Sequence, residues 1–226
     1  MKGDFHIHSS YSDGELSPKE IVILAKRVGL DVISISDHNT VDGVEEAIKE
    51  SKKVNIKVVP AIELSTRYKG NRVHILGYFN SKIYKNKKFL DGLKLLKLKK
   101  INEFKNKIFD EKVTSKKKSK ISLEDGIKFL KMFNGKVILA HPVCLRKRIL
   151  NEVLKFDFDG IEAIHSRNTI KDTKYFLNLA EENGYIYTAG SDFHKLFDSH
   201  DKHGMIGNVY LELKNIDKLF GFWKNN

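Results

Sequence analysis

A short strand is expected at Asp4-Phe5-His6-Ile7-His8, because polar and apolar residues alternate along this stretch. Side chains in a strand alternate between its two faces, so His6 and His8 point to the same side. Two imidazoles on one face can share a cation. The loop that follows contains Asp13, and a carboxylate can join such a site. This stretch therefore predicts a strand whose carboxyl end carries metal ligands.

Strand and helix signals alternate through the residues that follow. A helix start is indicated at Ser17-Pro18-Lys19-Glu20, with a serine cap, a proline in the first turn and a glutamate three residues after the serine. Gly29 is expected to end this helix. A further helix is expected over 41–51, and further strands over 32–36, 56–62 and 72–79.

The same alternation returns after a long helical stretch. Strands are expected over 136–140, 160–164 and 185–189, helices near 145–154 and 170–183, and last a strand near 205–213 with a short tail helix. Repeated short strand–helix units predict an α/β fold with a mainly parallel sheet, either doubly wound or closed into a barrel.

The positions of the polar residues favour the barrel. Nearly every expected strand ends in His, Asp or Glu, and a barrel gathers its functional groups at the carboxyl ends of its strands. Seven of the nine histidines belong to this set. Imidazoles combined with carboxylates suit Mn²⁺, Fe²⁺ and Zn²⁺. The residues are His6, His8, Asp13, Asp37, His38, Glu63, His74, His141, Glu162, His165, Asp192 and His194.

Composition narrows the class of protein further. The 226 residues are enough for one domain, with room for a small insertion. The one cysteine, Cys144, excludes an intrachain disulfide and a thiolate cluster. No apolar run is long enough to cross a bilayer, and the first residues lack a signal-peptide pattern. We therefore expect a cytoplasmic protein with no membrane partner.

Lysines are concentrated in one segment. Between Lys82 and Lys136 there are 18 lysines, no arginine and six acids, which accounts for the whole net charge of +12. Residues 84–133 show helical periodicity, with an apolar stripe that contains Phe89, Leu93 and Phe104. The lysines have two interpretations: a solvated helical face, or a surface that binds nucleic acid.

Five motifs, in this order, resemble those of the PHP (polymerase and histidinol phosphatase) superfamily. They are the stretch from Asp4 to Gly14, Ser36-Asp37-His38-Asn39-Thr40, His74-Ile75-Leu76 before Gly77-Tyr78, Ala140-His141-Pro142, and Ser191-Asp192-Phe193-His194. The resemblance covers nearly the whole chain and is nearest to stand-alone phosphoesterases similar to bacterial nucleoside 3′,5′-bisphosphate phosphatases. It implies a distorted (β/α)₇ TIM-like barrel formed by residues 1–83 and 134–226. Residues 84–133 would be a small Lys-rich helical insertion that covers or flanks the site.

The resemblance also implies a cluster of two to three divalent cations, of Mn, Fe or Zn. One cation would be held by His6, His8, Glu63 and Asp192, a second by Asp13, His38 and His194, and a third by His74, His141 and the bridging Glu63.

A mechanism for phosphate hydrolysis can be written from these parts. A hydroxide that bridges two cations would attack phosphorus. Asp192 or His194 would orient the hydroxide, and His165 would protonate the leaving group or hold a phosphate oxygen. The substrate-binding candidates are Arg167, Arg146 and Ser10, with support of the loop as the alternative role of Ser10.

The expected function is hydrolysis of phosphomonoesters, on a phosphorylated small molecule such as a nucleotide or on a short oligonucleotide. One alternative is an exonuclease-like phosphodiesterase on RNA or DNA ends, with the Lys-rich segment guiding the strand. Another is a histidinol-phosphate phosphatase. Outside the enzymes, the alternative is a non-catalytic module that binds nucleic acid, which a loss of metal ligands would favour.

Overall fold

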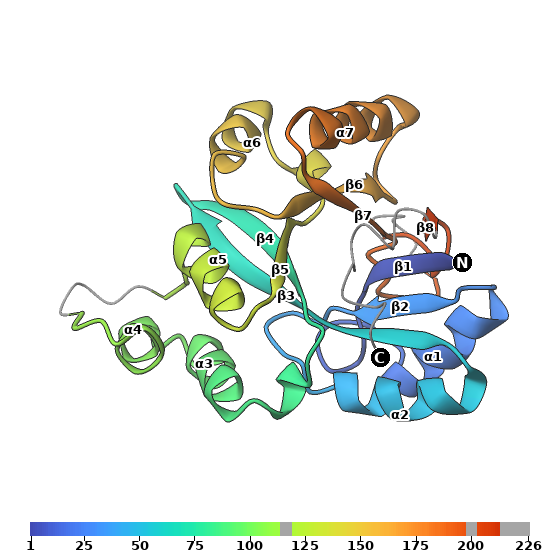
Figure 1. The fold of residues 1–226 in the computed structure, drawn as a ribbon, viewed down its shortest axis with the longest axis horizontal. Helices are drawn as coiled ribbons and strands as arrows, with labels where there is room; N and C mark the ends of the chain where they lie inside the picture. The colour runs from blue at the N-terminus through green and yellow to red at the C-terminus, as the bar shows by residue number, and fades with distance from the viewer. Residues whose placement is uncertain (114–118, 198–202, 213–226) are drawn as a thin grey trace.

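The computed structural model describes residues 1–113, 119–197 and 203–212. Its first elements follow the expected alternation (Figure 1): β1 (Lys2–Ile7), α1 (Pro18–Arg27), β2 (Val32–Ile35), α2 (Val44–Val54) and β3 (Lys57–Tyr68). The Ser17 hydroxyl accepts from the backbone N–H of Glu20, and the Glu20 carboxylate accepts from the N–H of Ser17. This reciprocal cap confirms the predicted start of α1.

The fourth strand runs antiparallel to both of its neighbours, β3 and the strand over 136–139. The chain turns after Tyr68, and β4 (Asn71–Tyr78) pairs antiparallel with β3 along its whole length. Two side chains predicted at strand ends lie elsewhere, although the expected strand over 72–79 agrees with β4 to within one residue. Glu63 lies in the middle of β3 rather than after its end, and His74 lies near the start of β4 rather than beyond a carboxyl end. Because β4 is reversed, its first residues still reach the rim where the parallel strands end.

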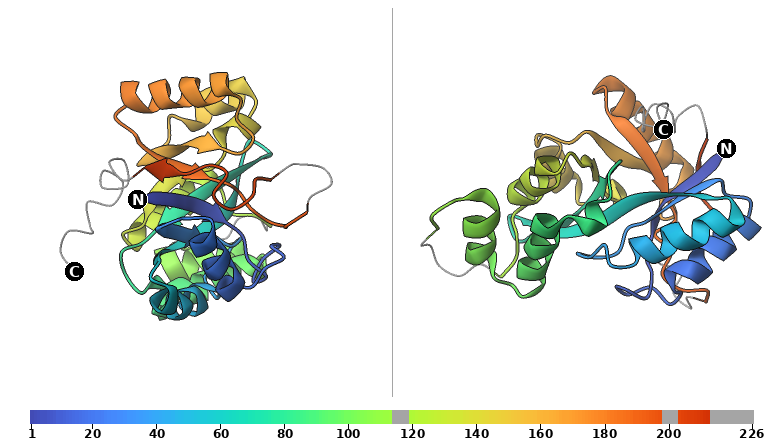
Figure 2. Two further views of the ribbon diagram at one scale, coloured as in Figure 1. Left: turned by 90° about the vertical axis from the view of Figure 1, so that its right-hand side faces the viewer. Right: turned by 60° about the horizontal axis from the view of Figure 1, so that its bottom comes forward.

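The remaining strands complete the curved sheet: β5 (Lys136–Leu139), β6 (Gly160–His165), β7 (Ile186–Gly190) and β8 (Leu211–Glu212). Their order is β7-β6-β5-β4-β3-β2-β1-β8. The 3-10 helices η1 (Ile83–Lys85) and η2 (Pro142–Cys144) and the helices α6 (Lys147–Val153) and α7 (Ile170–Glu182) lie between strands. Figures 1 and 2 show α6 and α7 on the opposite side of the strands from α1 and α2. The predicted tail helix falls outside the described residues.

The segment after β7 nearly closes the sheet into a barrel. The N–H of Asp192 donates to the carbonyl of His6, and the N–H of His8 donates to the carbonyl of Phe193. The buried carboxylate of Asp4 accepts from the N–H groups of His6, Ser191 and Gly207. The predicted α/β barrel is confirmed, with β4 and the short β8 antiparallel to their neighbours.

Residues 84–133 form the helices α3 (Lys87–Lys97), α4 (Ile101–Phe109) and α5 (Leu123–Met132). The predicted apolar stripe faces inward, and Phe89, Phe104 and Phe129 are fully buried. The rings of Phe89 and Phe129 stack at 5.0 Å, and those of Phe104 and Phe129 meet edge-on at 5.1 Å. Because α5 also packs on β3, β4 and β5, Phe129 connects α3 and α4 to the sheet.

Replacing Phe129 with alanine should remove this connection. Truncation of a buried phenylalanine costs about 3–5 kcal/mol of unfolding free energy, through lost burial and an unfilled cavity. Urea unfolding followed by circular dichroism measures the loss. Met132→Ala, an exposed position on the same helix, is the control and should change the free energy of unfolding little. Equal losses in the two variants would contradict the packing described.

Candidate metal centre

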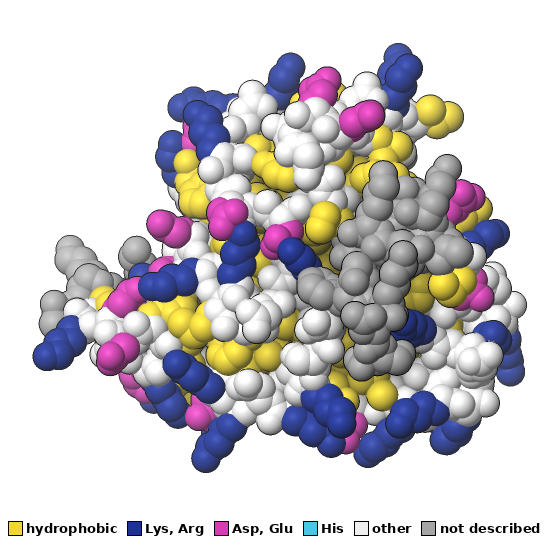
Figure 3. Space-filling view, in the orientation of Figure 1, with side chains coloured by type: hydrophobic (Ala, Val, Ile, Leu, Met, Phe, Trp, Pro, Cys, Tyr) yellow, Lys and Arg dark blue, Asp and Glu magenta, His cyan; other side chains and the backbone are white. Residues whose placement is uncertain are grey.

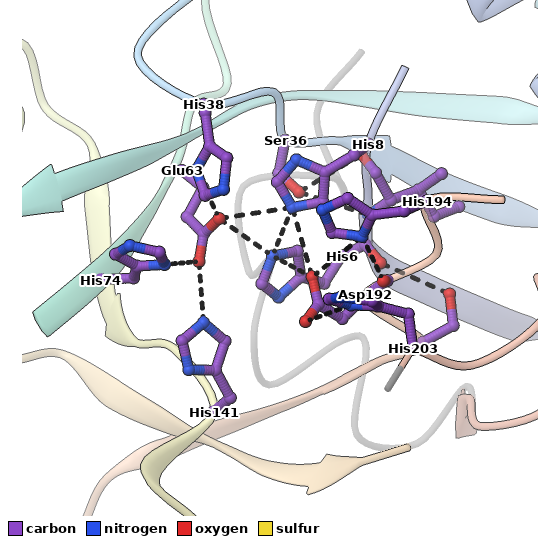
Figure 4. A network of polar contacts seen from close by, with 12 residues as sticks. His6, His8, Ser36, His38, Glu63, His74, His141, Asp192, His194 and His203 are labelled. Atoms are coloured by element: carbon purple, nitrogen blue, oxygen red, sulfur yellow. Dashed lines mark hydrogen bonds and ion pairs between the residues drawn. The ribbon is translucent and has the colours of Figure 1, made fainter. Parts of the chain in front are cut away.

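The centre of the site is the buried carboxylate of Glu63, which faces five imidazoles (Figure 4). Its Oε1 lies 2.9 Å from Nδ1 of His74 and 3.0 Å from Nε2 of His141. Its Oε2 lies 2.9 Å from Nδ1 of His38, 3.3 Å from Nε2 of His8 and 3.5 Å from Nε2 of His6. One residue of β3 thus gathers side chains from the ends of β1 and β2, from β4 and from the segment after β5.

Two further carboxylates face the same imidazoles. Asp192 Oδ1 lies 3.4 Å from Nε2 of His6 and 3.3 Å from Nε2 of His8. Asp13 Oδ1 lies 3.5 Å from Nδ1 of His8 and 3.4 Å from Nε2 of His194, and its Oδ2 lies 3.7 Å from Nε2 of His38. The structure therefore brings together all nine side chains that were predicted as ligands.

The atoms that face the centre fit divalent cations. Glu63 Oε2 and His38 Nδ1 are buried and have no hydrogen-bond partner in the described part of the chain. For His38 and Glu63 this holds although their atoms lie 2.9 Å apart, because the pair lacks hydrogen-bond geometry. Buried polar atoms are normally satisfied. Donor atoms around a tetrahedral zinc, with bonds of about 2.1 Å, lie about 3.4 Å apart, close to the spacings found here.

Several overlapping groups of three or four side chains could each hold a cation. They are His8, Asp13, His38 and His194; His6, His8 and Glu63; His38, Glu63 and His74; His6, His165 and Asp192; and Asp192, His194 and His203. The predicted assignment of ligands to three separate cations stays a prediction, because His6, His8, His38 and Glu63 each belong to two of these groups.

Glu162 and Asp37 hold the ligands in position. Glu162 is fully buried on β6, where its Oε1 lies 3.0 Å from Nδ1 of His6 and its Oε2 accepts from the N–H of His141 at 2.7 Å. A carboxylate on Nδ1 directs Nε2 of His6 toward the centre. Asp37 accepts from the hydroxyls of Ser9 and Ser12, which shapes the loop that leads to Asp13.

His165 differs from the other imidazoles in its hydrogen bonding. Its Nδ1 accepts from the backbone N–H of Arg167 at 3.1 Å, so in the neutral ring the proton lies on Nε2. That atom lies 3.5 Å from Oδ2 of Asp192. A ligating histidine usually donates its second N–H instead. This arrangement fits the predicted role of His165 as a proton donor better than a role as a ligand.

A cavity of about 410 Å³ opens over the cluster. Arg167 lines it, with Nη1 3.5 Å from Sγ of Cys144. Arg146 and Ser10 are exposed and are not among its lining residues, and their predicted substrate contacts stay predictions.

Sequence reasoning missed two residues that line this cavity, Arg72 and His203. Arg72 lies two residues before His74 on β4, so the spacing rule applied to His6 and His8 could have found it. No sequence signal pointed to His203, whose Nδ1 lies 3.1 Å from Oδ2 of Asp192 and whose ring lies 3.9 Å from that of His194.

Strained backbone accompanies two of the predicted ligands. His141 and Asp192 have φ values of 27° and 54°, in a region that residues with a side chain rarely adopt. The N–H of each is held, that of His141 by Glu162 and that of Asp192 by the carbonyl of His6. Such conformations persist where the surroundings impose them and are concentrated at functional sites.

The cluster shifts the pKa values of its members in opposite directions. Burial alone would raise the pKa of Glu63, but the charges of His74, His6 and His38 hold it well below its ordinary value. Burial would lower the pKa of His8, yet the nearby carboxylates of Asp192 and Glu63 raise it to about 9. Without a cation, the carboxylates are charged and His8 carries a proton at neutral pH.

Comparison with known proteins identifies the family. The model of the PHP domain matches residues 4–213, so the chain belongs to the PHP family. A 5′-3′ exoribonuclease of Haemophilus influenzae is 34% identical over 160 residues, which is 70% of this chain and 54% of that protein. The chain thus spans about half the length of this relative. A 3′,5′-nucleoside bisphosphate phosphatase of Chromobacterium violaceum is 31% identical over 74 residues, 33% of this chain and 26% of that protein.

Solved structures share the fold. A candidate metal-dependent phosphoesterase from Bifidobacterium adolescentis superposes with a TM-score of 0.74 at 19% identity, covering 96% of this chain and 94% of that one. An amidohydrolase from Chromobacterium violaceum superposes with a TM-score of 0.73 at 19% identity, covering 94% and 92%. No helix in the described residues is long and apolar enough to cross a membrane.

Glu63→Gln should abolish binding of more than one cation per chain. The amide keeps the shape but loses the charge that faces five imidazoles, and its nitrogen cannot act as a ligand. Elemental analysis after dialysis against Mn²⁺ or Zn²⁺ measures the loss. Glu124→Gln, at an exposed position on α5, is the matched control. Retention of the full metal content by Glu63→Gln would overturn its central role.

Metal affinity should rise with pH between about 6 and 9, because ligands must lose protons to bind. In the metal-free protein, hydrogen bonds with Cys144 and Glu63 outweigh burial and raise the pKa of His141 to about 10, and that of His8 is about 9. Binding should therefore release protons. Calorimetric titration with Zn²⁺, in buffers of different ionisation enthalpy, measures both effects. A pH-independent affinity would contradict the proposed ligands.

Proposed function

We propose that this chain is a metal-dependent phosphoesterase that hydrolyses phosphomonoesters of nucleotides or short oligonucleotides. The observation that carries the proposal is the juxtaposition of two features in one cavity. Its floor holds Glu63 and the imidazoles that surround it, and its walls hold two guanidinium groups, those of Arg72 and Arg167. Cations suit the floor, and phosphate oxygens suit the walls.

Two to three divalent cations bound by these ligands would supply an activated water at neutral pH and neutralise charge on the phosphoryl oxygens. Side chains of the protein would orient the water, bind the phosphate and supply a proton. Asp192 and His194 orient the attacking water. Arg72 and Arg167, from β4 and from the loop after β6, hold the non-bridging oxygens through paired N–H groups. His165, whose Nδ1 accepts from the N–H of Arg167, would supply a proton for the leaving alkoxide from Nε2.

The names of two relatives support a nucleotide substrate. One is named as a 5′-3′ exoribonuclease and the other as a 3′,5′-nucleoside bisphosphate phosphatase. The first name favours a second candidate function, that of a phosphodiesterase that removes nucleotides from an RNA or DNA end. The stretch matched by the exoribonuclease covers 70% of this chain, so this candidate function rests on more of the chain than the phosphatase name does.

Hydrolysis of histidinol phosphate and a purely nucleic-acid-binding role have less support. Histidinol phosphate carries an ammonium group that would need a free carboxylate. Among the described residues that line the cavity, Asp13, Glu63 and Asp192 are the acids, and each already faces imidazoles. A non-catalytic module would not need nine intact ligand side chains in one place. Both observations favour an enzyme that acts on phosphorylated nucleotides.

A phosphate-release assay in the presence of Mn²⁺, combined with elemental analysis, tests the proposal. The substrates are a nucleoside 3′,5′-bisphosphate, nucleoside monophosphates, histidinol phosphate and a short 5′-phosphorylated RNA. We expect two to three metals per chain and turnover of a nucleotide or of the RNA. Release of mononucleotides from the RNA would select the phosphodiesterase. Fewer than one metal and no turnover would overturn the proposal.

A further inference from the structure

Beside the metal centre, the face of the β3–β4 hairpin continues as a basic surface. Arg67 lies directly opposite Arg72 across the two strands, on the same face as Ser65 and His74. Like charges placed opposite each other across a sheet are destabilising. In the described part of the chain, no acidic side chain forms an ion pair with either arginine. An anion bound between them would offset this repulsion.

Two hollows connect this face with the helical region. One, of about 220 Å³, is lined by Asp13, His38, Arg67, Arg72, His74 and Lys120, among others. The next, of about 250 Å³, shares His38, Asn39, Ser65 and Lys120 with it and reaches Lys97 and Lys99 at the turn between α3 and α4. The N–H of Arg67 donates to the carbonyl of Ile121, which places Lys120 beside the hairpin. We call this series of hollows the basic groove.

The lysines of the helical region differ in their ion pairing. Several that lie away from the groove are neutralised by acids: Lys105 lies 2.9 Å from Asp125, Lys107 lies 2.8 Å from Asp91, and Lys128 lies 2.6 Å from Glu111. On the face shown in Figure 3, basic side chains over α3 and α4 are likewise interspersed with acidic ones. By contrast, Lys97, Lys99 and Lys120 are exposed and form no ion pair with a described residue. Positive charge is therefore uncompensated where the groove runs.

The lining of the groove indicates which anion it fits. No Phe, Tyr or Trp is among the described residues that line the two hollows, so bases have no large aromatic ring to stack on, and the imidazoles present, His38 and His74, face Glu63. Arg67, Arg72, Lys97, Lys99 and Lys120 supply positive charge, Asn39 and Ser65 add polar side chains, and Asp13 is the one acid among the described residues of the lining. Such a surface suits the phosphates of a strand irrespective of its sequence.

We propose that the basic groove binds the backbone phosphates of a single-stranded oligonucleotide whose terminal phosphate lies at the metal centre. The inference rests on the proposed function, since His38 belongs both to the centre and to the two hollows. Arg72 contacts the strand at the centre, Arg67 and Lys120 follow, and Lys97 and Lys99 contact the phosphates farthest from it. A mononucleotide would not reach these last two lysines.

The test compares two triple variants with equal loss of charge. The groove variant is Lys97→Gln/Lys99→Gln/Lys120→Gln. The control is Lys82→Gln/Lys87→Gln/Lys88→Gln, whose side chains are exposed, form no ion pair with a described residue and line neither hollow. With Mn²⁺ present, kcat/KM is measured on a 5′-phosphorylated single strand and on a nucleoside monophosphate, over a range of salt concentrations.

We expect the groove variant to lose at least about tenfold more activity on the single strand than on the monophosphate, mainly through KM. Its slope of log kcat/KM against log salt should be shallower by about 2, since each phosphate contact contributes about 0.7. The control should match the unaltered protein. Equal losses of activity on the single strand in the groove and control variants, or an unchanged salt slope, would overturn the proposed role of the groove.

Binding separates failure of the groove from failure of the proposed function. Fluorescence anisotropy of a labelled single strand with the metal-loaded protein requires no turnover. If no substrate is hydrolysed but the groove variant alone binds the strand more weakly, the groove stands and the proposed function fails. If substrates are hydrolysed but both variants bind the strand equally, the groove fails and the proposed function stands.

Discussion

The structure depends on one buried negative charge. A carboxylate removed from water, as Glu63 is, costs several kcal/mol unless opposite charges or cations surround it. The chain meets this cost with five imidazoles, drawn from segments that span residues 6 to 141. Only a sheet curved almost into a barrel can bring those segments to one point. Closure by the segment after β7 and the geometry of the candidate ligands are thus consequences of the same constraint.

The reversed direction of β4 places a basic side chain beside the candidate metal ligands. If β4 ran parallel to β3, its first residues would lie at the opposite end of the sheet from the ligands. As an antiparallel partner it presents His74 to Glu63 and Arg72 to the cavity, two residues apart on one face. The hairpin also extends the rim on one side of the centre, and the turn between α3 and α4 lies along this extension. A ligand centre and a basic surface are therefore continuous.

Two acidic residues near the site, Glu162 and Asp37, have a different role from the candidate ligands. Glu162 and Asp37 have the same chemistry as the candidate ligands, and they lie within β6 and just after β2. Glu162, however, faces Nδ1 of His6 and a backbone N–H, and Asp37 faces two serines. Both fix the directions of other groups. His165 also differs from the candidate ligands, because its Nδ1 accepts a hydrogen bond from the backbone N–H of Arg167.

The sequence by itself determined the class of fold and which side chains would lie together at the candidate metal centre. Local periodicity and caps specify strands and helices, and polar residues at strand ends reveal a common rim. It did not determine the direction of β4, because antiparallel and parallel strands have the same alternation. The sequence also could not show which lysines form ion pairs with acids and which do not. Ion pairs such as Lys107–Asp91 join residues on different helices, and the pairing depends on packing that only the tertiary structure decided.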